Sequence, residues 1–135
     1  VLKEAMAPFA DKIRFVVRYF PLEAIHANAW RAALAAAAAN AQGKFFEYIE
    51  ILYTHQDALD DASLKKYAAD LGLNVKQFEL DFNSEKTVAS VRKDMADGES
   101  YGIRGTPTIY VNGLSVRRLS AEGFKTAIDK VLGNK

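Results

Sequence analysis

The chain has 135 residues, of which 50% are hydrophobic, and its 18 basic and 17 acidic side chains leave a net charge of +1. This size and apolar content predict one folded domain and exclude a disordered chain. The balanced charge offers no basic stripe for nucleic acid, and no apolar run approaches the roughly 20 residues that cross a bilayer. We therefore expect neither nucleic-acid binding nor membrane insertion.

The N-terminal segments predict a short helix and then a strand. Apolar side chains recur at helical spacing over residues 1–10, and Pro8 predicts a kink because proline lacks the N–H of a helix interior. Residues 13–20 are β-branched and aromatic, with a nearly continuous apolar run that is typical of a strand covered on both faces. Pro21 ends this predicted strand.

A block of helices is predicted next. The alanine-rich residues 25–42 favour a helix that ends at Gly43, and residues 44–55 carry one apolar stripe. Three further helices are predicted from their N-cap residues: one from Asp61 to Gly72, a short one from Asn74 with Gln77 in the capping-box position, and one from Ser84 to near Gly98.

The C-terminal third returns to strands. Gly105-Thr106-Pro107 leads into a predicted strand over residues 108–111, because a proline that opens a strand removes no ladder hydrogen bond. Asn112-Gly113 favours a two-residue hairpin turn, since both positions tolerate positive φ. Residues 114–119 are the predicted partner strand, and Ser120 caps an amphipathic final helix.

No spacing of side chains predicts a metal or acid–base site. His26 and His55 lie far apart without a carboxylate motif, and we interpret them as a helix-start or packing residue and an exposed helix-end residue. The acidic residues are interpreted as caps and exposed faces. Core or helix-packing roles are predicted for the aromatic residues Trp30, Phe45, Phe46, Phe78 and Phe82, although a role in lining a peptide groove stays open. We expect no metal and no organic cofactor.

Segments along nearly the whole chain match the pattern of one family in the same order. They are residues 12–22, His26 with the alanine-rich helix after it, and residues 41–48, 67–73, 101–108 and 111–113, followed by the closing helix. Together they resemble the DsbA-like thiol–disulfide oxidoreductases of the thioredoxin superfamily. The resemblance implies a mixed α/β, helix-dominated fold. It would be a single thioredoxin-like domain over residues 1–135 with a helical insertion at about residues 24–100.

The chain differs from that family at its N-terminus. Family members begin with one or two strands and a Cys-x-x-Cys turn, whereas this chain contains no cysteine. We therefore expect it to be N-terminally incomplete, beginning inside the active-site helix. Disulfide exchange needs an attacking thiolate and a resolving thiol. The parent activity would be disulfide exchange on protein substrates, but this chain should hold no catalytic residue and should be inactive alone.

The resemblance places a substrate-docking role at one loop. In the family, the residue before a cis-proline offers backbone hydrogen bonds to an extended substrate, and this role falls on Thr106 and Pro107, with Gly105 and Arg104 beside them. A trans proline that opens an edge strand is the plainer alternative, and Arg104 is either a charge beside the loop or a solvated side chain. The implied partners are unfolded or extended proteins, and the implied setting is the bacterial periplasm or the cell exterior.

The absent N-terminal strand has a structural consequence. In thioredoxin-like sheets it lies between the strands that match residues 13–19 and 108–111. We expect the gap to be filled by direct pairing of those strands, by a second copy of the chain in a homodimer or strand exchange, or by a segment supplied in trans.

Two other functions remain open at this stage. One is a non-redox, chaperone-like module that binds peptides. The other is a relative of the glutathione-transferase kappa or hydroxychromene-carboxylate isomerase type, which shares the helical insertion but uses a serine near the first helix.

Overall fold

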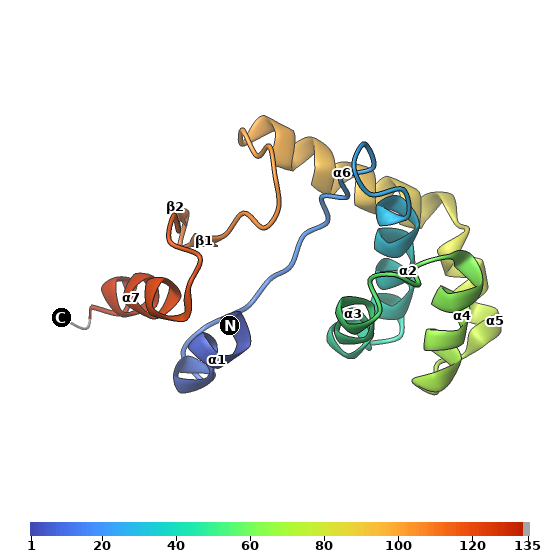
Figure 1. Cartoon of the computed structure of the whole chain (residues 1–135), viewed down its shortest axis with the longest axis horizontal. Coiled ribbons are helices and arrows are strands. Elements are labelled where there is room, and N and C mark those ends of the chain that lie inside the picture. The colour runs from blue at the N-terminus through green and yellow to red at the C-terminus, as the bar shows by residue number, and fades with distance from the viewer. Residues whose placement is uncertain (134–135) are drawn as a thin grey trace. The chain divides into compact units, whose positions relative to one another are not determined.

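The computed structural model describes residues 1–133 and divides the chain into two compact units (Figure 1). Unit 1 combines Val1–Val17 with the chain from Gly105 onward, and unit 2 is Arg18–Arg104. Helices dominate, and the one sheet among the described residues is a two-stranded hairpin. The prediction of a mixed, helix-dominated α/β fold is therefore confirmed. None of the helices in residues 1–133 has the length and apolar character needed to cross a bilayer.

Unit 2 is a cluster of helices around one alanine-rich helix. Its helices are α2 (Ala29–Ala41), α3 (Phe45–Thr54), α4 (Asp61–Asp70), α5 (Val75–Phe82) and α6 (Glu85–Ser100). Helix α2 packs against each of the other four, because its small side chains let neighbouring helices approach closely. The largest fully buried side chains of this core are Leu34, Tyr48, Leu64, Phe78, Phe82 and Val91. Phe46, predicted to be a core or packing residue, is instead 48% exposed.

Short polar side chains set where these helices begin. The side chains of Asn74 and Ser84 accept hydrogen bonds from the backbone N–H three residues ahead, as predicted. The cap of α4 is Asp60 rather than Asp61, and it accepts from the N–H of Ser63. The capping box of α5 is not closed by Gln77, since the side chain of Gln42 accepts the N–H of Asn74 at 2.9 Å.

Two helix boundaries differ from the prediction. Helix α2 begins at Ala29, because turns occupy the residues before it. Helix α6, predicted to end near Gly98, continues through this glycine and ends at Ser100. A Cβ at Gly98 would lie 2.8 Å from Cδ2 of Phe20, so this glycine lets the aromatic ring pack against the helix.

Unit 1 joins the two ends of the chain. Helix α1 (Leu2–Met6) and a 3₁₀ turn (Ala7–Phe9) that contains Pro8 precede an extended segment. Strands β1 (Tyr110–Val111) and β2 (Leu114–Ser115) and helix α7 (Ala121–Val131) close the chain. Helix α1 packs against α7, and the buried side chains of this unit are Ala5, Phe9, Phe124 and Ile128.

The hairpin has the turn that the sequence predicts. Asn112 and Gly113 have φ of 46° and 80°, the left-handed values of a two-residue turn between twisted strands. Tyr110 pairs with Ser115 and Val111 with Leu114. Both strands are shorter than predicted, since the ladder ends within a few residues of the turn.

The prediction of a strand over residues 13–20 is wrong for the chain by itself. These residues take part in no ladder among residues 1–133, and the sheet contains only β1 and β2. A strand needs a neighbouring strand to which its backbone is hydrogen-bonded, and a high β propensity does not provide that neighbour. Direct pairing with residues 108–111, one of the three ways in which the gap could be filled, is therefore absent.

Candidate functional site

The loop before β1 presents the residues to which docking was assigned. The peptide bond between Thr106 and Pro107 is cis. The side chains of Thr106, Pro107 and Thr108 are exposed. The hydroxyl of Thr108 donates to the carbonyl of Gly105 at 2.7 Å and so closes the loop on itself.

The backbone of Thr106 is open to a ligand. Within residues 1–133, neither its N–H nor its C=O has a hydrogen-bond partner. Three residues further on, the carbonyl of Ile109 already accepts the N–H of Val116 at 2.9 Å. Among the described residues, the free main-chain groups of Thr106 thus lie in the exposed loop before β1, where an extended chain could pair with them.

The predicted site residues divide between the two units. Gly105, Thr106 and Pro107 share the loop of unit 1, whereas Arg104 is an exposed residue at the end of unit 2. No ion pair of Arg104 occurs within the described part of the chain. A Cβ at Gly105 would meet no atom within 4 Å, so neither crowding nor a positive φ requires glycine there.

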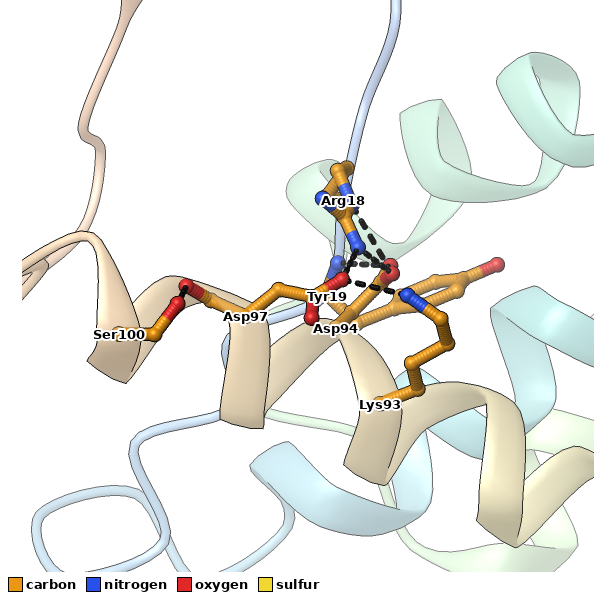
Figure 2. A network of polar contacts seen from close by, with 6 residues as sticks. All are labelled: Arg18, Tyr19, Lys93, Asp94, Asp97 and Ser100. Atoms are coloured by element: carbon orange, nitrogen blue, oxygen red, sulfur yellow. Dashed lines mark hydrogen bonds and ion pairs between the residues drawn. The ribbon is translucent and has the colours of Figure 1, made fainter.

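A polar network in unit 2 was not predicted from the sequence. Figure 2 shows Arg18 reaching two acids on successive turns of α6. Its Nε and Nη2 donate to Oδ1 of Asp94 at 2.9 and 2.7 Å, and Nη2 also donates to Asp97. The other oxygen of Asp94 accepts the backbone N–H of Tyr19 at 3.0 Å, and Lys93 donates to Asp97 at 2.7 Å.

The charges in this network stabilise one another. Hydrogen bonds to Asp97 and Asp94 raise the pKa of Arg18 further above its already high usual value. Hydrogen bonds from Lys93 and then Arg18 lower the pKa of Asp97 below 3.8. Burial and the nearby Asp94 carboxylate raise the pKa of Tyr19 to about 12. Both oxygens of Asp94 and one oxygen of Asp97 accept hydrogen bonds from protein donors, so the network holds residues 18–19 on α6.

Sequence reasoning missed this network because its partners are 76 and 79 residues apart. The only local signal was the i,i+4 pair of Lys93 and Asp97, which the chain shares with many helix surfaces. The described residues contain no group of three or more His, Asp or Glu side chains that could hold a metal ion. The chain contains no cysteine, and the candidate loop offers the main-chain groups of Thr106 for hydrogen bonding.

Comparisons with known proteins match nearly the whole chain to one family. Residues 1–130 match the family described as Thioredoxin. The chain is 40% identical over 114 residues to a Na(+)/H(+) antiporter NhaA 1 of Mycobacterium sp. (strain KMS), which covers 83% of this chain and 19% of that protein. It is 39% identical over 115 residues to the protein of the same name from Mycolicibacterium vanbaalenii, covering 84% of this chain and 19% of the relative.

A more distant relative has a related name. A Na(+)/H(+) antiporter NhaA of Herminiimonas arsenicoxydans is 38% identical over 111 residues, which is 82% of this chain and 17% of that protein. The chain thus spans less than a fifth of the length of these relatives. The family match, in contrast, extends over nearly all of its residues. On that match, the chain belongs to the thioredoxin family.

Proposed function

We propose that this chain is the substrate-docking part of a DsbA-like protein thiol–disulfide oxidoreductase and binds extended polypeptide at the Thr106–Pro107 loop. The observation that carries the proposal is the exposed backbone of Thr106, which has no hydrogen-bond partner within residues 1–133, in a chain of the thioredoxin family. Extended substrates that pair with a free main chain gain affinity from hydrogen bonds and selectivity from their side chains. The proposed partners are unfolded or extended proteins, in an oxidising periplasmic or extracellular setting.

The reaction itself requires groups that this chain does not have. Exchange passes through a mixed disulfide, so both the attacking and the resolving atom must be sulfur. None of the 135 residues is cysteine. The docking surface and the reactive sulfurs are thus supplied by different segments in this proposal.

The redox part of the proposal is tested by insulin reduction with dithiothreitol. We expect the chain to leave the rate of insulin precipitation at its uncatalysed value, because no thiol is present to form the mixed disulfide. A rate above that background, proportional to the concentration of the chain, would contradict the assignment of the reactive atoms to another segment.

The docking part is tested with reduced, carboxymethylated α-lactalbumin as an unfolded probe that cannot form disulfides. Backbone amide signals of Thr106 and Thr108 should shift as the probe is added to the ¹⁵N-labelled chain. Thr106→Ala, which keeps both backbone groups, should bind as well as the parent. Thr106→Pro, which removes the N–H, should bind more weakly while its circular dichroism spectrum stays unchanged. Binding by Thr106→Pro at parental strength would exclude this N–H from docking.

A second candidate function is favoured by the relatives that are named Na(+)/H(+) antiporters. In this alternative the chain acts as a thioredoxin-family region attached to, or working beside, an antiporter. The test replaces the aligned region of the Mycobacterium antiporter with this chain, or deletes it, and measures Na⁺-dependent proton movement in everted vesicles. Exchange that is lost on deletion and restored by the replacement supports the alternative, and exchange that is indifferent to both changes excludes it.

A further inference from the structure

The second surface of interest is the free edge of β2. The hairpin is the whole sheet in the described residues, so β2 has β1 on one side and no strand on the other. A cleft of about 320 Å³ borders β2, and its lining includes residues 114–118, Val111 of β1 and the α7 residues Thr126, Ala127 and Lys130. Five consecutive residues line it. Successive residues of a strand point to opposite faces, and the lining includes both residues of β2 as well as Val111 of β1, so the cleft is not confined to one face of β2.

The register determines which main-chain groups face the cleft. The N–H of Val116 donates to the carbonyl of Ile109, on the β1 side. Inner-facing and outer-facing residues alternate in an antiparallel ladder, so the N–H and C=O of Ser115 point away from β1. The same alternation, continued past the bond of Val116, would turn the N–H and C=O of Arg117 away from β1 as well. Neither residue has another hydrogen-bond partner for these groups in the part of the chain that the structure describes. An exposed edge of this kind is a template for an added strand.

The side chains around the edge combine apolar surface with positive charge. Val111 and Val116 are half-buried beside the cleft, and Leu114 is 58% exposed. Arg118 is paired with Glu122 at 2.9 Å, but Arg117 and Lys130 are exposed and form no ion pair within residues 1–133. The unbalanced charge of the lining is therefore positive, and carboxylates complement it.

We propose that the β2 edge binds an extended polypeptide segment rich in apolar and acidic side chains, added as a third strand. The main chain of the segment pairs with Ser115 and Arg117, its apolar side chains enter the cleft, and its carboxylates approach Arg117 and Lys130. A small anionic amphiphile would use the charge and the apolar lining but would leave the two outward-facing backbone pairs unsatisfied. This site lies beyond the proposed docking loop and does not use Thr106.

The test follows ¹⁵N amide signals of the intact chain during titration with an acetylated, amidated peptide of alternating glutamate and valine. We expect shifts at residues 114–118 and affinity that falls as NaCl is added. Lys130→Glu should weaken binding at least about threefold, because it replaces an attraction with a repulsion. Lys125→Glu is the matched control on the same helix, outside the cleft lining, and should change the affinity less than twofold.

Strand addition is separated from simple charge attraction by two peptides methylated on alternate amide nitrogens. One set of methyl groups blocks the amides that would pair with Ser115 and Arg117, and the other set faces solvent. We expect at least about a fivefold loss for the first peptide and little change for the second, since only the first set of methyl groups removes main-chain hydrogen bonds to the edge.

Four outcomes would overturn the proposal: equal binding by the two methylated peptides, equal effects of Lys130→Glu and Lys125→Glu, stronger binding of decanoate than of the peptide, or shifts confined to Thr106 and Thr108. The last outcome contradicts the β2 site while leaving the docking loop intact. Shifts at residues 114–118 without shifts at Thr106 would support the β2 site and would not involve the docking loop.

Discussion

Replacing Gly123 with alanine sets two well-known effects against each other. Gly123 lies in the first turn of α7, where its N–H donates to the Ser120 hydroxyl at 3.1 Å. A Cβ at this position would lie 2.1 Å from the carbonyl oxygen of Arg118 and 3.0 Å from its carbonyl carbon. The obstacle is backbone, so no side-chain rotation can remove it.

The two effects have opposite signs. Helix propensity alone favours alanine over glycine by about 1 kcal/mol. The close contact requires the Arg118 carbonyl to move by about 1 Å, which costs about 1–3 kcal/mol as overpacking. That movement also weakens the bond from the Ser120 N–H to the same carbonyl, now 3.0 Å long, and the Ser120 cap, each about 1 kcal/mol. We expect Gly123→Ala to lower the free energy of unfolding by about 2–4 kcal/mol.

The assay is urea unfolding followed by far-ultraviolet circular dichroism, together with hydrogen exchange of the α7 amides. Lys125→Ala is the control, because it changes an exposed side chain on the same helix and should stay within about 0.5 kcal/mol of the parent. Faster exchange across α7 in Gly123→Ala would localise the effect. A Gly123→Ala protein as stable as the parent, or more stable, would refute the steric argument and leave propensity as the deciding factor.

Three other changes test the contacts of unit 2. Asp94→Ala removes the acceptor of both a guanidinium and a backbone N–H, and should lower the free energy of unfolding in urea by about 1–2 kcal/mol. Its control is Asp70→Ala, which breaks only an exposed i,i+4 pair and should lower this free energy by about 0.3 kcal/mol. Tyr48→Phe leaves the buried carbonyl of Leu64 without its 2.9 Å donor and should cost about 1–2 kcal/mol by the same measurement. The pKa of Asp97 is lowered below 3.8 in the folded chain, so its carboxylate stabilises the fold above that pH and loses this contribution as the pH falls further. Asp97→Asn should therefore flatten the decline of stability in acid, and an unchanged slope would contradict the lowered pKa.

The helices of this chain could be predicted because their signals are local. Asn74, Ser84 and Ser120 each accept an N–H three residues ahead, and such a bond depends on no distant part of the chain. The hairpin turn at Asn112-Gly113 is local in the same way. The prediction of Asp61 as the cap of α4 is wrong by one residue, since the cap is Asp60. Both aspartates fit the sequence pattern, and only the backbone angles decide between them.

The features that the sequence did not predict depend on distant contacts. The helix from Ser84 is predicted to end near Gly98 and ends at Ser100, but the pattern does not predict that Gly98 admits the ring of Phe20, which is far away in the sequence. The bond of Arg18 to Asp94 has the same character. The assignment of Thr106 and Pro107 to a loop before a strand came from a motif, and the structure adds that the backbone of Thr106 has no partner within the described residues.

Residues 13–17 show how a sequence pattern can be strong where the chain alone supplies no regular structure. Phe15 and Val16 are 40% and 60% exposed, although each would gain about 1.5–3 kcal/mol from full burial. No β ladder includes this segment, and each hydrogen bond of a ladder would add about 0.5–1.5 kcal/mol net. Both contributions depend on a neighbouring strand, and neither depends on the segment's own conformational preference. The β-branched and aromatic pattern therefore indicates an environment covered on both faces, and a strand partner from a second copy or another segment would stabilise it by several kcal/mol.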